Sequence, residues 1–356
     1  MDIKYLILIA LIANVIFCLV SSLALSAYVR NHDANKRPAC LISCIYFAFF
    51  AAVSATVYFL PRFYDFTTDV HARYFILPAA AFMLLAAISL IVKHRLFLPL
   101  AALLLAVTVV FGLPDFHITF TAVLPLWLNR VLTVFLWLAA AFSLRLFNAN
   151  DGLVAIETLG ISFGIFILSL IGALPFLVGC FSLDAAAVSF ALLLYGAYPA
   201  QISLDRRGCD LLGLLLGWLI IFAAAEGAGA AVIIFCLPLI CETLWSLAKR
   251  FTFLAAYADV YANPIYYQAA AGGLHPKIIN TFFGRINVVL LLFGGFQVFA
   301  PNSYSLPMLC AVITVWNLYR LQHWQEQPRN LRDINRRFVS DIKDGVRNIK
   351  DSLRKD

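Results

Sequence analysis

The polar side chains that could take part in chemistry are concentrated in a few short segments between long apolar runs. These segments have the sequences RNHDANKRPA, KHR, LFNANDGL, PAQISLDRRGCD and, after the lysine at position 249, YANPIYYQAAAGGLHPK. They offer carboxylates, amides and guanidinium groups, which are the side chains that bind metal ions and phosphate groups. If they share one side of a membrane, they suit an enzyme that combines a soluble substrate with a membrane-embedded one.

The composition indicates that most of the chain is surrounded by membrane lipid. Hydrophobic residues make up 63% of the 356 residues and charged residues 13%, whereas a soluble domain is about half apolar and a quarter charged. Apolar runs of roughly 18 to 25 residues recur, and each can cross a hydrocarbon layer about 30 Å thick. Because the backbone in lipid must satisfy its own hydrogen bonds, we expect an all-α, polytopic membrane protein with about eleven transmembrane helices.

The expected spans can be placed along the chain. They are Tyr5–Tyr28, Cys40–Leu60, Tyr74–Val92, Leu96–Leu113, Trp127–Phe147, a long segment from Val154 that contains Pro175, Leu183–Tyr198, Leu211–Ala225, Ala230–Leu247, Ile286–Phe299 and Leu306–Leu321. We therefore expect a transmembrane domain over residues 1–321 and a separate tail over residues 322–356. An alternative for the first segment is a signal peptide, but no small-x-small cleavage site follows it.

The basic residues predict the orientation. With eleven spans, 22 of the 26 Lys and Arg residues fall in the odd-numbered loops and the tail. The other side has only Lys4, Arg62, Arg73 and Arg130. Because cytoplasmic loops carry an excess of Lys and Arg, we expect the N-terminus outside and the C-terminus in the cytoplasm.

The ionisable residues inside or near the spans are few, and the tail is amphipathic. We count Glu157, Glu226, Glu242 and Arg130, which argues against an ion-coupled transporter, since these usually carry ionisable groups inside their spans. Between Asn330 and Asp356 the apolar residues recur every three or four positions, with Lys and Arg between them. This basic amphipathic helix suits an anionic membrane surface, or alternatively a partner helix. The net charge of +7 therefore requires no nucleic acid.

Three stretches resemble the polyprenyl-phosphate N-acetylhexosamine-1-phosphate transferase superfamily. They are LPLWLNRVLTVFLWL followed by NANDGLVA, YPAQISLDRRGCDLLGLLLGWL, and LPLICETLWSLAKRF. Members of that superfamily have ten or eleven spans and a cytoplasmic active site. The resemblance implies transfer of a sugar 1-phosphate from a UDP-sugar to polyprenyl phosphate with Mg²⁺, in envelope polysaccharide or peptidoglycan synthesis in a bacterial inner membrane.

The residues that carry the family's chemistry differ at several aligned positions. In the double-aspartate motif, Arg145 replaces an asparagine, Asn148 replaces the first aspartate, and Asp151 keeps the second. The magnesium-binding aspartate aligns with Arg206, one residue after Asp205. The resemblance thus makes Asp151, Asn148 and Asp205 the candidate catalytic residues.

The candidate substrate-binding residues follow from the same alignment. The family's histidine-rich loop aligns with residues 264–267, and His275 is the histidine that remains in that loop. The implied set is Arg145, Arg206, Arg207, Tyr266, Tyr267 and His275. The family's aspartate pair after an earlier span is replaced by the sequence KHR at residues 93–95.

These replacements disfavour a magnesium site. Mg²⁺ takes oxygen ligands, usually one or two carboxylates with substrate phosphates, and a guanidinium group at Arg206 would repel it. We expect no protein-held metal and no other cofactor, with Mg²⁺ only if the protein acts as the family does. Arginine binds phosphate bidentately without metal. We therefore hypothesise that a polyprenyl phosphate or another anionic lipid binds between Arg145, Arg206 and Asn148.

Simpler roles remain open for these residues. Asp151 could cap the helix that starts near Val154, and the arginines at 206 and 207 could only set the topology. Tyr266 and Tyr267 could be interfacial aromatics, and His275 a solvated loop residue.

Three classes of function are compatible with the sequence. One is a divergent sugar-1-phosphate transferase with impaired magnesium-dependent catalysis. The second is a non-catalytic scaffold or lipid-phosphate-binding regulator of a sibling membrane enzyme, and the third is a transporter. The expected partners are membrane lipids, polyprenyl phosphate, a UDP-sugar, and a second copy of the chain or a sibling enzyme.

Overall fold

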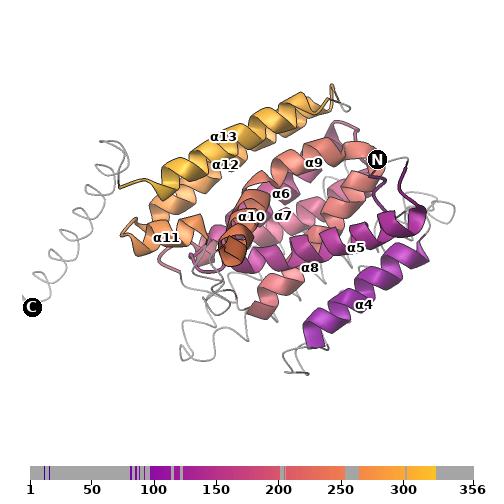
Figure 1. Cartoon of the computed structure of the whole chain (residues 1–356), viewed down its shortest axis with the longest axis horizontal. Coiled ribbons are helices and arrows are strands. Elements are labelled where there is room, and N and C mark those ends of the chain that lie inside the picture. Colours follow the sequence, from indigo (N-terminus) through magenta and orange to yellow (C-terminus); the bar gives the residue numbers. More distant parts are fainter. Residues whose placement is uncertain are drawn as a thin grey trace, which may run out of the picture.

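The computed structural model describes residues 97–113, 116–120, 123–200, 204, 206–252, 264–300 and 303–325, with a few single residues before them (Figure 1). The first three expected spans and the tail beyond residue 325 lie outside this part. The regular elements of the described part are all helical. Five stretches are long and apolar enough to cross a membrane: Leu126–Phe147, Leu153–Leu170, Val178–Gly196, Arg206–Phe235 and Pro276–Gln297. The protein is therefore a multi-pass α-helical membrane protein, as expected.

The fourth and fifth expected spans match two helices on one side of the bundle. Helix α4 comprises Phe97–Gly112, and α5 comprises Leu126–Ser143 and continues as the 3-10 turn η3, Leu144–Phe147. Both present large apolar side chains away from the protein, with Leu104 and Phe135 each 66% exposed. Such faces suit contact with lipid acyl chains.

The sixth expected span is wrong in one respect, because Pro175 does not lie inside it. Helix α6 comprises Leu153–Leu170, and α7 comprises Phe176–Gly196 with Pro175 at its N-cap. Gly172 has φ +84°, a left-handed conformation that ends α6 and that glycine adopts without strain. The proline starts the next helix, where its missing N–H costs nothing. The seventh expected span therefore begins seven residues too late, and Asp184 lies buried within α7.

Helices α8 to α10 correspond to the eighth and ninth expected spans. Helix α8 comprises Arg206–Ala223, and the π-helical segment Ala224–Ala228 follows it. Gly227 in that segment has φ +92°, so the chain changes direction there. Helices α9 (Gly229–Phe235) and α10 (Leu237–Thr252) lead away from the turn. The predicted break at residues 226–229 is confirmed, whereas α8 starts five residues before the expected Leu211.

Close packing of α5 against α8 depends on small residues. A Cβ atom at Gly213 would collide with the backbone of Ala141, and one at Gly217 would lie 2.7 Å from Cδ1 of Trp137. The indole nitrogen of Trp137 donates a hydrogen bond of 2.9 Å to the carbonyl of Leu214. Small residues let backbones approach within a membrane, and interhelical hydrogen bonds then hold them.

The last three helices form the side of the bundle opposite α4 (Figure 1). They are α11 (Ile265–Ala271), α12 (Pro276–Gln297) and α13 (Ser305–Gln322). The tenth expected span, from Ile286, captured only the second half of α12, whereas the eleventh matches α13 to within a residue. Helix α6 lies among α7, α8, α9 and α12, and most of its residues are buried, apart from a stripe that includes Phe163 and Leu170. It is therefore the central helix of the described bundle.

Candidate functional site

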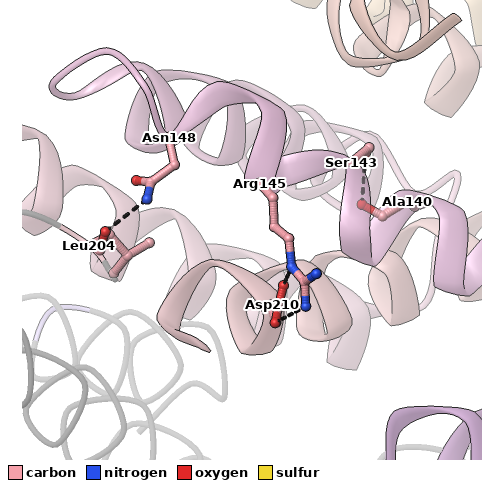
Figure 2. A network of polar contacts seen from close by, with 6 residues as sticks. All are labelled: Ala140, Ser143, Arg145, Asn148, Leu204 and Asp210. Atoms are coloured by element: carbon pink, nitrogen blue, oxygen red, sulfur yellow. Dashed lines mark hydrogen bonds and ion pairs between the residues drawn. The ribbon is translucent and has the colours of Figure 1, made fainter. Parts of the chain in front are cut away.

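Two of the stretches that carry the resemblance meet the loop aligned with the family's histidine-rich loop at one end of the bundle. We call this the three-loop end, and it comprises residues 144–152, residues 197–200 with Leu204, and residues 264–276. The side-chain amide of Asn148 donates a hydrogen bond of 2.9 Å to the carbonyl of Leu204 (Figure 2). On the other side, the rings of Tyr198 and His275 make an edge contact with 4.7 Å between centroids. Each loop therefore contacts another one that is distant in sequence.

The strongest interaction of this region is an ion pair between Arg145 and Asp210. Nε and one Nη of Arg145, in η3, donate to the two carboxylate oxygens of Asp210, in the first turns of α8 (Figure 2). The side chain of Asp210 is 2% exposed and that of Arg145 16%. The guanidinium group also lies 4.8 Å from the ring centroid of Phe142. A bidentate pair of this kind fixes both geometry and charge.

Tyr266 connects the third loop to the first. Its side chain is fully buried, its hydroxyl donates to the carbonyl of Leu146, and the same oxygen accepts the N–H of Ala149 at 3.3 Å. Its ring stacks on Phe147 at 5.8 Å and meets Phe283 edge-on. Burial raises the pKa of Tyr266 far above its usual range. It is thus a neutral hydroxyl that ties two loops together, and it is not the interfacial aromatic that the sequence allowed.

Helix α11, which carries Tyr266, is held by a buried carboxylate. The side chain of Glu242 in α10 is fully buried, and its two oxygens accept the backbone N–H groups of Ile265 and Tyr266 at 2.9 and 3.3 Å. Further along α11, the side-chain oxygen of Gln268 accepts a hydrogen bond of 2.9 Å from Lys249 of α10. The first N–H groups of a helix have no acceptor within the helix, and the carboxylate of Glu242 is the acceptor for two of them.

Asp151 occupies the turn before α6, where Asn280 of α12 organises the backbone. The amide nitrogen of Asn280 donates 2.7 Å to the carbonyl of Asp151, and its oxygen accepts 2.7 Å from the amide of Asn150. The N-cap position of α6 is Gly152, and no side chain makes a capping hydrogen bond there. The capping role considered for Asp151 is therefore not observed. Its side chain is half-buried at the surface of the three-loop end.

The remaining predicted site residues lie around this cluster. Arg206 is exposed at the first position of α8, and Arg207 is half-buried beside it. Tyr267 is 38% exposed, on the outer side of α11. Nδ1 of His275 accepts the N–H of Lys277 at 3.2 Å and caps α12. Burial first, and then the charge of Lys277, lower the pKa of His275, which favours this neutral capping form. The predicted catalytic residue Asp205 lies outside the described residues.

The described residues do not fit the magnesium ion that the resemblance implies. Both oxygens of Asp210 already face a guanidinium group, and the nitrogen of Asn148, which cannot ligate a cation, points to Leu204. Within the described part of the chain, His, Cys, Asp and Glu side chains nowhere gather in groups of three that could hold a metal.

Sequence analysis missed three residues that organise this end. Asp210 looked like the start of an apolar span, but its spacing of four residues from Arg206 could have indicated a helix that begins earlier. Asn150 and Asn280 were given no role from the sequence. Only the folded chain shows that they meet, since 130 residues separate them in sequence.

Comparisons with known proteins add no assignment. No model of a protein family matches the chain, and no curated protein matches it.

The ion pair predicts a specific pattern of stability. Replacing Asp210 by Asn or Arg145 by Gln leaves one buried charge without its partner, so each change should cost about 3 to 5 kcal/mol. The double variant Arg145→Met/Asp210→Leu should recover most of this loss, because it removes both charges together. Unfolding in detergent micelles, followed by near-UV circular dichroism, measures the effect. The exposed Arg285→Gln should stay within about 0.5 kcal/mol. Single variants as stable as that control would show that the pair does not hold the fold.

Proposed function

We propose that the protein is a divergent relative of the polyprenyl-phosphate sugar-1-phosphate transferases that binds the phosphate of a polyprenyl lipid at the three-loop end without magnesium. The observation that carries this proposal is a meeting at one end of the bundle. There the first two resembling stretches contact the loop aligned with the family's histidine-rich loop, through Asn148–Leu204, Tyr198–His275 and Tyr266–Leu146. Sequence order alone does not require these contacts. They support a shared arrangement of the loops in which only the charges have changed.

The arrangement shifts phosphate recognition from the first loop to the start of α8. Arg145 was expected to bind phosphate, but its contacts with Asp210 make it a neutral, structural pair. Arg206, which is exposed, and Arg207 stand at the N-terminus of an 18-residue helix. A helix N-terminus carries a partial positive charge that adds to that of the arginines. Because α8 begins an apolar stretch that extends to Phe235, this charge lies where a lipid phosphate emerges from the bilayer.

The balance of charges favours binding over magnesium-dependent transfer. Phosphoryl transfer from a UDP-sugar relies on cations that neutralise the transferred phosphate, usually Mg²⁺ held by carboxylates. Here the buried carboxylate of Asp210 is neutralised by Arg145, and that of Glu242 accepts the backbone N–H groups of α11. Asp151 is the described acid within the loops themselves. The protein would then act as a lipid-phosphate-binding scaffold or regulator of a sibling membrane enzyme, in a bacterial inner membrane. The catalytic alternative keeps Asp151 as the reactive group.

The binding test uses undecaprenyl phosphate in nanodiscs with excess EDTA. The wild type should bind, and Arg206→Gln/Arg207→Gln should bind far more weakly. Each charge-assisted contact contributes about 1.5 to 3 kcal/mol, and about 1.4 kcal/mol corresponds to tenfold in affinity. The matched control is Arg285→Gln, which removes a basic residue from α12 and should leave affinity unchanged.

Two outcomes would contradict the proposal. One is equal affinity of the wild type and the double variant in EDTA. The other is release of UMP from UDP-N-acetylhexosamine in the presence of undecaprenyl phosphate and Mg²⁺, with loss of turnover in Asp151→Asn. That second result would instead establish the catalytic alternative.

The orientation is part of the proposal, because the phosphate site must face the cytoplasm. On the described helices, Arg145, Arg206, Arg207 and Lys249 lie toward the three-loop end, and Arg130 lies near the opposite end of α5. We expect a single cysteine at position 206, in a variant without the native cysteines, to react with a membrane-impermeant maleimide only after the membrane is opened. Labelling in intact cells from the outer side would refute this orientation. A cysteine at position 227, in the turn after α8, should show the opposite pattern.

A further inference from the structure

A second polar site lies inside the bundle, away from the three-loop end. Glu157 belongs to the central helix α6 and is fully buried. Its Oε1 accepts a hydrogen bond of 3.2 Å from the side-chain amide of Asn287 in α12. Its Oε2 is also buried and has no hydrogen-bond partner among the described residues. A buried acidic side chain with one carboxyl oxygen that lacks a hydrogen bond requires an explanation.

The surroundings of Glu157 hold the acid in a fixed position. The amide of Asn287 also donates 3.3 Å to the backbone carbonyl of Ile156. Gly160 lies one turn after Ile156, and a Cβ atom there would be 2.9 Å from the Asn287 amide nitrogen. The missing side chain at Gly160 therefore makes room for Asn287. This close contact between α6 and α12 places a neutral donor against one oxygen of the acid and leaves the other oxygen for a different ligand.

The charges near Glu157 do not compensate a negative charge. Glu242 of α10 is also fully buried, and it carries the same sign of charge as an ionised Glu157 would. The buried thiol of Cys236, between α9 and α10, likewise offers no positive charge. Glu242 uses both of its oxygens as acceptors for the backbone of α11, so its proton-free form matches its contacts. Glu157 accepts a hydrogen bond through Oε1 alone, so its contacts do not require the ionised form.

An ionised carboxylate that is buried with only a neutral amide as partner is unfavourable, because nothing replaces the water that it has lost. A bound proton removes that cost and needs no further space. We propose that Glu157 is a proton-binding carboxyl group in the interior of the bundle, with Asn287 as the residue that positions it. The ligand of this site is thus a proton. The proposal is independent of phosphate binding at the three-loop end.

Infrared spectroscopy of the purified protein in lipid at neutral pH tests the proposal. The wild type should show the carbonyl stretch of a protonated carboxyl group, shifted in D₂O, and Glu157→Gln should lose a component of that band. Because glutamine resembles the neutral acid in shape, this variant should also keep or raise the melting temperature. Glu242→Gln is the matched control, since its new NH₂ group would face backbone N–H donors. That control should lower the melting temperature by several degrees and leave the Glu157 component in place.

Either of two results would overturn the proposal. The first is a protonated-carboxyl band that is absent from the wild type or unchanged in Glu157→Gln. The second is a Glu157→Gln protein that fails to fold or melts as low as Glu242→Gln, since a neutral isostere would then not replace the native side chain. Loss of the band component with retained stability supports the proton site.

Discussion

The ion pair between Arg145 and Asp210 is the interaction on which the three-loop end depends. Both groups lie where water is scarce, so each charge needs a partner within the protein. Their two parallel contacts hold η3 against the first turns of α8. The ion pair therefore positions η3 and the turn that follows it. In this segment Asn148 donates a hydrogen bond to Leu204, and the hydroxyl of Tyr266 is hydrogen-bonded to Leu146 and Ala149. Tyr266 is placed in turn by Glu242 through the start of α11. Two buried acids thus organise this end of the bundle.

The same ion pair changes what the first loop can offer a ligand. The sequence alone indicated that Arg145 would join Arg206 in a strongly cationic site. With Asp210 beside it, Arg145 contributes geometry, and its charge is neutralised within the protein. The carboxylate of Asp210, which could have bound a metal ion, pairs with Arg145 instead. The proposed change from magnesium-assisted transfer to phosphate binding rests on this exchange of partners.

Some of the fold follows from the sequence because helix length and apolarity are local properties. The spans predicted at Leu96–Leu113 and Leu306–Leu321 match α4 and α13 to within a residue at each end. The errors arise where polar residues lie inside helices. Asp210 was placed outside a span because acids are rare in lipid, yet it is buried within the bundle. The early start of α12 at Pro276 was missed because Lys277 and Arg285 resemble loop residues.

The candidate site was harder to predict than the fold, since its contacts join residues that are distant in sequence. Of the residues that the resemblance named, Arg145, Asn148, Asp151, Tyr266 and His275 lie in the loops that meet. The resemblance did not give their partners, because Asp210, Asn280 and Leu204 carry no motif of their own. The role of Glu157 was likewise out of reach, because it depends on which oxygen of a buried acid lacks a hydrogen bond.

The central claim is that a lipid phosphate binds at the three-loop end without a metal ion. A polyprenyl phosphate that carries a photoreactive group beside the phosphate tests it most directly. After illumination in lipid with EDTA, mass spectrometry of the digested protein should locate cross-links in residues 145–152, 198–210 and 264–280, and excess undecaprenyl phosphate should suppress them. Cross-links spread over the lipid-facing sides of α4 and α13, or cross-links that need Mg²⁺, would contradict the account.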